Sequence, residues 1–197
     1  MSTRAAAAEV TRERILAAAS EAFMRGWYDD VTLRDIAADA GVALQTLVNH
    51  FGGKEALFAA AAERIGQSIS SMRWTVEAGD WDAAARTLVD DYDLTGDFII
   101  RTLAVEERVP AVAPALELGR RGHQEWVEHV FAAALDGVRG AARKRRVAQL
   151  VAATDVYTWK LLRRDKGLSR DQTMTAIREL VEALHQALRH QTGGGTE

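Results

Sequence analysis

The residues whose types and spacing best suit a chemical role lie in one segment, TLRDIAADAGVALQTLVNHF, which spans residues 32–51. A short helix over about residues 43–50 would expose the polar side chains of Gln45, Thr46 and Asn49. When such a helix follows a tight turn, its early residues can lie over base edges in the major groove of DNA. The chemistry expected of this segment is therefore non-covalent recognition of base edges.

Two short helices must position these side chains. The first is indicated by Thr32 with Asp35 three residues later, which resembles a capping box, followed by apolar residues at helical spacing. Gly41 permits the tight turn, and the small residues Ala37 and Ala38 let the two helices approach closely. This pattern is typical of a helix-turn-helix, although an ordinary helical hairpin in a bundle has the same spacing.

The sequence offers little for catalysis. It contains no cysteine, which excludes disulfides, thiol nucleophiles and cysteine-ligated metals. It also lacks a Gly-x-Ser-x-Gly elbow, a His-Glu-x-x-His motif and a phosphate-binding glycine loop. In HQEWVEH, residues 123–129, Glu125 and His129 share a helix face, but such pairs are common on solvated faces, and two ligands make a weak site. We expect no catalytic residues, no metal and no cofactor.

Composition indicates an all-α protein. The chain has 197 residues, of which 48% are hydrophobic and 27% charged, with a formal net charge of −3 and only two prolines. Its long uninterrupted stretches are rich in Ala, Leu, Arg and Glu, which favour helix, and no segment alternates regularly between apolar and polar residues. No apolar run approaches the roughly 18–20 residues that a bilayer requires, and the N-terminus has no apolar stretch of signal-peptide length. We therefore expect a cytoplasmic location and no membrane partner.

Helical periodicity predicts the order of the helices. They are expected at about residues 7–25, 33–40, 43–50, 54–74, 80–94, 96–109, 114–137 (with an interruption near Gly119 or Gly122), 141–164 and 169–190. Ser169 and Gln172 form a second capping box at the start of the last helix.

The segment from Ile15 to Phe58 resembles the N-terminal domain of the TetR (tetracycline-repressor) family of transcriptional regulators. The order and spacing of the matching residues hold without a gap over about a quarter of the chain. They are Phe23, Gly26, Thr32-Leu33-Arg34-Asp35-Ile36-Ala37, Ala40-Gly41-Val42, Thr46-Leu47, His50-Phe51, Lys54-Glu55 and Leu57. The rest of the chain matches only in length and helical character. The resemblance favours the helix-turn-helix over the ordinary hairpin.

Carried over to this sequence, the resemblance implies a set of DNA contacts. The recognition helix would supply Gln45, Thr46, Asn49 and His50, and Arg34 on the preceding helix could reach a base. Arginine pairs well with guanine, and asparagine or glutamine with adenine. Thr32 and Lys54 lie at helix N-termini, which favour a phosphate, and His50 is another candidate phosphate contact. For each residue the alternative is a cap or a solvated side chain, and this alternative is strongest for Thr32.

Three residues depart from the family pattern. Ala43 stands where a serine usually caps the recognition helix, a loss of order 1 kcal/mol in helix stability. Gln45 replaces a usually small residue, and Val48 stands where a tyrosine commonly contacts phosphate. These departures predict a lower affinity or an unusual operator.

The resemblance also implies that the second domain dimerises and encloses a small-molecule pocket. The candidate ligand-binding residues are Trp74, Phe98, Trp126, Asp155 and Trp159. The candidate dimer interface is formed by Val151, Leu162, Val181 and Leu184. A role in the hydrophobic core is the alternative for the aromatic and aliphatic residues, and Asp155 is either a ligand anchor or satisfied by a neighbouring helix.

These inferences combine into one expectation for the whole chain. Residues 1–53 form a helix-turn-helix DNA-binding domain, residues 54–190 a larger helical domain for effector binding and dimerisation, and residues 191–197 a disordered tail. The protein is expected to be a non-enzymatic, ligand-responsive regulator that binds double-stranded operator DNA as a homodimer and responds to an unidentified small molecule. Repression is favoured, with activation as the alternative.

Overall fold

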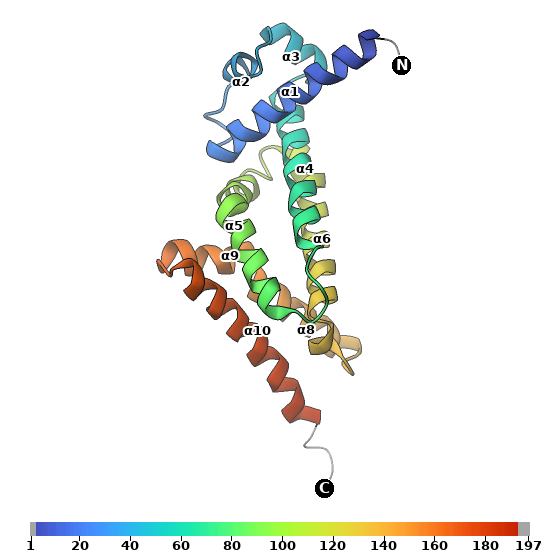
Figure 1. Cartoon of the computed structure of the whole chain (residues 1–197), viewed down its shortest axis with the longest axis vertical. Coiled ribbons are helices and arrows are strands. Elements are labelled where there is room, and N and C mark those ends of the chain that lie inside the picture. The colour runs from blue at the N-terminus through green and yellow to red at the C-terminus, as the bar shows by residue number, and fades with distance from the viewer. Residues whose placement is uncertain (1–2, 193–197) are drawn as a thin grey trace. The chain divides into compact units, whose positions relative to one another are not determined.

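The computed structural model describes residues 3–192, and within that range it contains helices and no strand (Figure 1). The all-α class predicted from composition is confirmed. Among these residues no helix combines the length and apolar character needed to cross a membrane. Of the tail predicted over residues 191–197, residues 193–197 lie outside the described part of the chain. The first two residues of that tail, Gln191 and Thr192, are the last residues of the C-terminal helix.

The chain divides into two compact units. Unit 1 contains residues 1–68 and 98–119, and unit 2 contains residues 69–97 and 120–197. The chain enters unit 1 twice, so this unit includes a segment far from the N-terminus. The domain boundary expected between residues 53 and 54 stays a prediction.

Unit 1 is built around three N-terminal helices. These are α1 (Thr3–Arg25), α2 (Leu33–Asp39) and α3 (Leu44–Phe51), and all three contact one another. Unit 1 also holds the first part of α4 (Lys54–Arg73), the end of α5 (Trp81–Ala104), the 3-10 turn η1 (Pro110–Val112) and the start of α6 (Ala113–Val130).

An aromatic cluster forms part of the core of unit 1. The ring of Phe58 lies 4.7 Å from the ring of Phe23 and 6.4 Å from that of Phe98, measured between centroids. Ile36 on α2 and Leu47 on α3 are fully buried as well. Each short helix thus contributes an apolar side chain to the core, and this anchors the pair.

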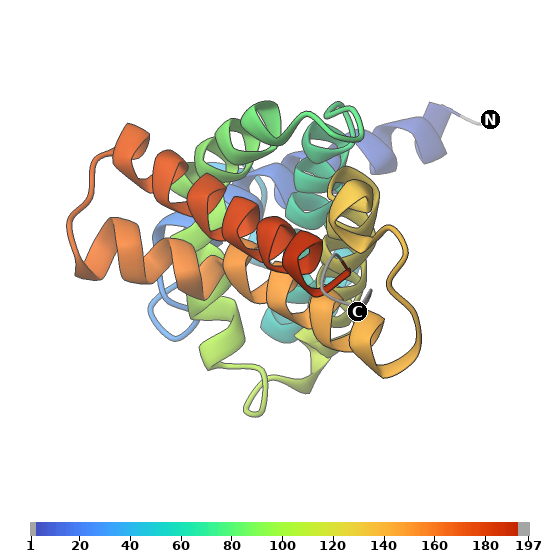
Figure 2. The same cartoon turned by 90° about the horizontal axis from the view of Figure 1, so that it is seen from below.

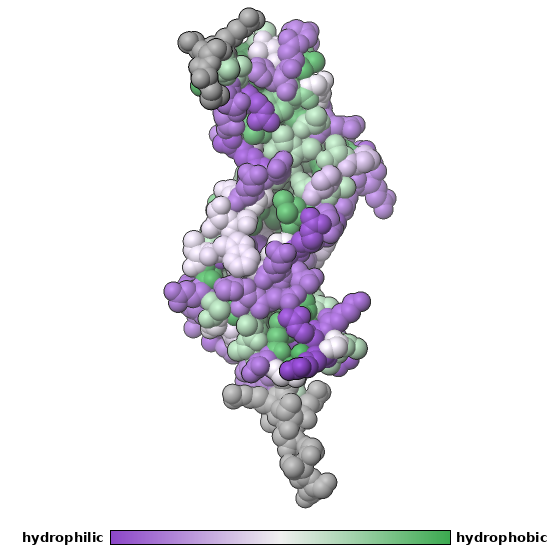
Figure 3. All heavy atoms as spheres, turned by 90° about the vertical axis from the view of Figure 1, so that its right-hand side faces the viewer, coloured by the Kyte–Doolittle hydropathy of each residue, from purple (hydrophilic) through white to green (hydrophobic). Residues whose placement is uncertain are grey.

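Unit 2 contains the remainder of α4, α5 and α6 together with the C-terminal helices. The latter are α7 (Ala132–Leu135), α8 (Gly140–Thr154), α9 (Val156–Trp159), the π-helical turn η2 (Lys160–Asp165) and α10 (Arg170–Thr192). Helix α10 packs along α8, as Figure 2 shows. On the face drawn in Figure 3, hydrophobic residues are scattered among hydrophilic ones.

The helix expected to end before Gly96 continues through it. Residues 80–94 and 96–109 were expected as two helices, but α5 is continuous from Trp81 to Ala104. A Cβ atom at Gly96 would lie only 2.5 Å from the Trp159 ring. The glycine therefore makes room for an indole, and the prediction of a helix break was wrong.

Two other helix predictions also need correction. The helix expected over residues 141–164 ends at Thr154, because Asp155 caps a new helix by accepting a hydrogen bond from the Tyr157 N–H (2.9 Å). Helix α6 passes through Gly119 and Gly122 without interruption and is followed by α7 after Phe131. Asp155 is thus satisfied by its own backbone neighbour, an alternative that the sequence did not suggest.

Candidate nucleic-acid interface

Helix α2 begins with the cap that the sequence predicts. The backbone N–H of Asp35 donates to the Thr32 hydroxyl oxygen (3.2 Å), and that hydroxyl donates to the Asp35 carboxylate (2.6 Å). The Thr32 hydroxyl is therefore engaged within the chain, which is the alternative role weighed for it.

The turn between α2 and α3 is fixed by a glycine and by an arginine from α1. Gly41 has a φ of +63°, a conformation that glycine adopts without strain. The Arg14 guanidinium donates to the carbonyl oxygens of Ala40 (2.5 Å) and Gly41 (3.3 Å). Arg14 thus provides hydrogen-bond donors for two carbonyl groups that follow α2, and it connects α1 to the turn. Sequence analysis missed it, because the contact spans 26 residues.

Helix α3 buries one side chain, leaves three exposed and half-buries the rest. Leu47 is fully buried, whereas Gln45 and Asn49 are exposed and joined by a hydrogen bond from Gln45 Nε2 to Asn49 Oδ1 (2.9 Å). Leu44, the first residue of α3, is 41% exposed although it is apolar. Ala43 provides no side-chain cap, in agreement with its departure from the family pattern.

The loop between α1 and α2 is held by two cations. Lys54 Nζ donates to the Asp29 carbonyl oxygen (3.3 Å) and lies 4.5 Å from the centre of the Tyr28 ring. Partial burial lowers the pKa of Lys54. The guanidinium of Arg108 donates to both carboxylate oxygens of Asp29 (3.3 and 2.8 Å), and this hydrogen bonding lowers the pKa of Asp29.

A second arginine from the same distant segment supports the end of α1. Arg101 Nη2 donates to the Met24 carbonyl oxygen (2.6 Å), and its guanidinium lies 6.0 Å from the centre of the Trp27 ring. Arg101 and Arg108 are 77 and 79 residues from their partners. No local pattern marks such contacts, so sequence analysis did not find them.

All seven predicted DNA-contact residues lie in unit 1, on or beside α2 and α3. Four have exposed side chains and three are half-buried; the exposed ones are Thr32, Arg34, Gln45 and Asn49, and the half-buried ones are Thr46, His50 and Lys54. The structure joins Gln45 to Asn49 directly. Their individual contacts with DNA stay predictions.

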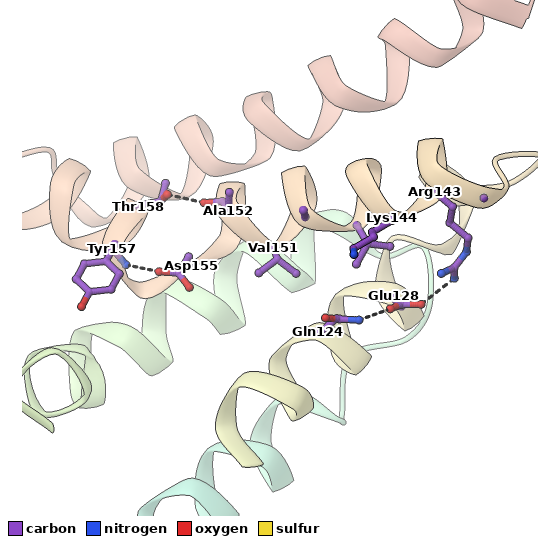
Figure 4. Close-up of a pocket in the computed structure, with 12 residues that line it drawn as sticks. Gln124, Glu128, Arg143, Lys144, Val151, Ala152, Asp155, Tyr157 and Thr158 are labelled. Carbon is purple, nitrogen blue, oxygen red and sulfur yellow. Dashed lines mark hydrogen bonds and ion pairs between the residues drawn. The ribbon is translucent and has the colours of Figure 1, made fainter. Parts of the chain in front are cut away.

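In unit 2, α6, α8 and α9 border an open groove of about 800 Å³ (Figure 4). Val147 and Val151 give it apolar lining, and an ion pair between Arg143 and Glu128 (2.7 Å) lies at one end. Of the five residues predicted to bind a ligand, Asp155 alone lines this groove. Val151, predicted for the dimer interface, lines it as well.

The aromatic residues predicted for the ligand site are divided between the two units and differ in burial. Trp126 and Trp159 are buried in unit 2, and their indole N–H groups donate to the Arg73 carbonyl oxygen (2.9 Å) and to Asp93 (3.0 Å). Phe98 is buried in unit 1, and Trp74 is 46% exposed. The core alternative therefore applies to Trp126, Trp159 and Phe98.

The predicted dimer residues also differ in accessibility. Val181 is only 1% exposed within the single chain, so its side chain belongs to the core of unit 2 and has no surface left for a partner. Leu162 and Leu184 are half-buried and keep part of their surface. The assignment of Val181 must therefore be changed, while that of the two leucines stays a prediction.

A buried polar cluster in unit 2 was not expected from the sequence. Arg73 on α4 forms an ion pair with Asp91 on α5 (2.6 Å), and their side chains are 7% and 0% exposed. Arg73 Nη1 also lies 2.8 Å from His123 Nδ1 on α6. Because a guanidinium only donates, Nδ1 must be the acceptor, so His123 is neutral and its proton is on Nε2, 3.2 Å from the Thr154 hydroxyl.

Burial and the Arg73 charge lower the pKa of His123 to about 3. Glu125 and His129, the pair expected on a solvated face, are both exposed, whereas His123 on the same helix turns toward the buried cluster. Within the described residues no group of three or more His, Cys, Asp or Glu side chains could hold a metal ion.

Comparison with protein families gives a match, and it lies in the N-terminal region. Residues 15–61 match the family model described as bacterial regulatory proteins, tetR family. A comparison with curated protein sequences finds no match.

Two solved structures illustrate the similarity in fold. A tetR-family transcriptional regulator from Streptomyces coelicolor has a TM-score of 0.74 at 19% identity, over 94% of this chain and 86% of that one. A transcriptional regulator from Rhodococcus sp. Rha1 has a TM-score of 0.71 at 17% identity, over 89% of this chain and 96% of that one. At these identities the similarity establishes the fold, and the fold extends over both units.

Proposed function

We propose that this protein is a cytoplasmic transcriptional repressor that a small molecule releases from its operator, and the match of residues 15–61 to the tetR family of bacterial regulatory proteins supports this. The observation that carries the proposal is the exposed α3 helix, held by the Gly41 turn and presenting Gln45 and Asn49 away from the core. In this geometry α3 enters the major groove and α2 crosses the phosphate backbone. The protein binds DNA and effector and catalyses no reaction.

Within the interface we assign two kinds of contact. Gln45, Thr46, Asn49 and Arg34 contact bases, and they determine which sequence is bound. His50 and Lys54 contact phosphates through their side chains. At Thr32, whose hydroxyl already donates to Asp35, the contact is made by the backbone N–H groups at the start of α2. These contacts set affinity and its salt dependence. The ammonium group of Lys54 is held by the α1–α2 loop, so it reaches a phosphate only from that position.

The operator complex requires a homodimer. One recognition helix reads too few base pairs for specificity, and a two-fold dimer places two of them about 34–36 Å apart, one turn of DNA, or at a multiple of that spacing. The packed pair α8 and α10 supports a four-helix seam, to which Leu184 on α10 and Leu162 in the neighbouring η2 turn contribute. The effector binds in unit 2, where the groove beside α8 has a volume within the usual range for small-molecule sites.

The test is selection of bound duplexes from a randomised library, followed by titration with variants. Replacing Gln45 or Asn49 by alanine should change sequence preference at about 1–3 kcal/mol per lost base contact. Lys54→Ala should weaken binding to all sequences alike and flatten the salt dependence. Enrichment of no sequence by the wild-type protein would contradict the proposal, and a helical adaptor that binds only protein would give that result.

Effector release is tested by reciprocity. A ligand found by tryptophan fluorescence should bind the free protein more tightly than the operator complex, by the same factor by which it weakens DNA binding. A ligand with equal affinity for both forms shifts no equilibrium, and that result would refute ligand control.

A further inference from the structure

The exposed face of α3 carries two parallel stripes of different chemistry. Gln45 and Asn49 are four residues apart and form the polar stripe, linked by their 2.9 Å hydrogen bond. Leu44 and Val48 are also four residues apart and form the apolar stripe beside it, with Leu44 41% exposed and Val48 half-buried. Residues at this spacing are neighbours along a helix surface.

The hydrogen bond within the polar stripe leaves a defined set of groups free to contact DNA. Gln45 Nε2 donates to Asn49 Oδ1, so the carbonyl oxygen of Gln45 stays available as an acceptor and the Nδ2 group of Asn49 as a donor. Adenine presents the complementary pair in the major groove, an N6 amino donor beside an N7 acceptor. The two amides together therefore match one adenine edge.

The apolar stripe matches the other side of the same base pair. Across the major groove an A·T pair presents N7, the N6 amino group, the thymine O4 atom and then the thymine 5-methyl group. The methyl is the one apolar group that any base pair offers there, and it is the natural partner for an exposed leucine. A single exposed leucine needs no explanation, but this one lies directly beside the base-reading pair.

From this arrangement we propose that α3 reads an A·T base pair with both stripes. Gln45 Oε1 accepts from adenine N6, Asn49 Nδ2 donates to adenine N7, and Leu44, supported by Val48, packs on the thymine methyl. The proposal rests on the DNA-binding function above and adds Leu44 as a residue that determines specificity. Each operator half-site should therefore contain an A·T pair at the centre of the α3 contact.

Base analogues test each stripe separately in the duplex enriched from the randomised library. Deoxyuridine in place of thymidine removes only the 5-methyl group, and 7-deazaadenine in place of adenine removes only the N7 acceptor. At the contacted pair, we expect wild-type protein to lose affinity about fourfold per half-site with deoxyuridine, the equivalent of one buried methylene-sized group. We expect a loss of about fivefold or more with 7-deazaadenine.

Variants assign each loss to its residue. Leu44→Ala should bind the thymidine duplex more weakly and be insensitive to deoxyuridine, while keeping its sensitivity to 7-deazaadenine. Asn49→Ala should show the opposite pattern. Leu118→Ala is the matched control, because Leu118 is an exposed leucine of unit 1 (53%) outside α3, and it should respond to both analogues as the wild type does.

The outcomes separate this inference from the proposed function. If the wild-type protein enriches a duplex but tolerates deoxyuridine at every thymidine of the half-site, DNA binding stands and the thymine contact is refuted. A deoxyuridine penalty that persists in Leu44→Ala also refutes the assignment to Leu44. If no duplex is enriched, the proposed function itself fails. The analogue titrations with wild-type protein need no variant, so they decide the question even if a variant folds poorly.

Discussion

Replacing Asp91 by asparagine should destabilise unit 2 strongly, because it leaves the Arg73 guanidinium buried without a counter-charge. Asp91 accepts from Arg73 Nε (2.8 Å) and Nη2 (2.6 Å), and the Thr95 hydroxyl donates to its other oxygen (2.9 Å). Asparagine keeps the shape and an acceptor for Thr95, and it removes only the negative charge. Breaking a buried ion pair in this way costs about 3–5 kcal/mol.

That loss corresponds to a decrease of about 6–20 °C in melting temperature for a protein of this size. The assay is thermal unfolding followed by circular dichroism and calorimetry, with urea titration as an independent measurement. A neighbouring residue supplies the matched control. Asp90, on the same helix, pairs with Arg170 at 2.6 Å, but their side chains are 48% and 40% exposed. Asp90→Asn should leave the transition nearly unchanged, because solvent screens exposed pairs.

The double variant Arg73→Met, Asp91→Leu extends the test. It replaces both charges by apolar groups, so it should recover most of the stability lost by Asp91→Asn. If Asp91→Asn melts within a degree or two of Asp90→Asn, the guanidinium is not desolvated as the structure indicates, and the reasoning from burial is refuted.

Three further changes have expected outcomes. Burial holds the pKa of His123 at about 3, so between about pH 6.5 and 3 the unfolded chain binds the extra proton. The free energy of unfolding should then fall by up to about 1.4 kcal/mol per pH unit on acidification. His123→Gln should reduce this pH dependence, measured by urea titrations at pH 7 and 5. Equal pH dependence in the variant and the wild type would refute the assignment to His123. Gly41→Ala should lower the free energy of unfolding by about 1–3 kcal/mol, because the residue has a φ of +63° and its Cβ would lie 2.7 Å from Arg14 Nη2. It should also weaken operator binding in a gel-shift titration. Unchanged binding would show that the turn is not needed. Gly96→Ala should lower the free energy of unfolding by about 1–3 kcal/mol, measured by urea titration, because its Cβ would overlap Trp159. A gain in stability would mean that helix propensity outweighs the clash.

Local signals made the helix-turn-helix predictable. Three signals each act within a few residues: the Thr32 cap, the Gly41 turn, and the apolar residues at helical spacing in the two short helices. The structure shows all three. The same dependence on local signals explains the error at Gly96. Glycine weakens a helix in isolation, but here the absence of a side chain admits an indole from a helix more than 60 residues away.

The buried cluster could not be predicted in the same way. Arg73, Asp91 and His123 lie on three helices, and each occurs beside other polar residues that are exposed. Only the packing of those helices decides which charge is buried. The roles of the tryptophans could not be predicted for a related reason, because tryptophan is equally suited to a core and to a cavity. In the structure the side chains of Trp126 and Trp159 are buried in unit 2.

The contacts that Arg101 and Arg108 make with the end of α1 and the α1–α2 loop have a consequence for engineering. Hybrid regulators are made by joining the DNA-binding portion of one protein to the sensor portion of another. A junction placed at residue 53 or 68 would transfer Met24, Trp27 and Asp29 but leave both arginines behind. A hybrid that retains the loop geometry must also receive residues 98–119, so the transferable module of this protein is discontinuous in sequence.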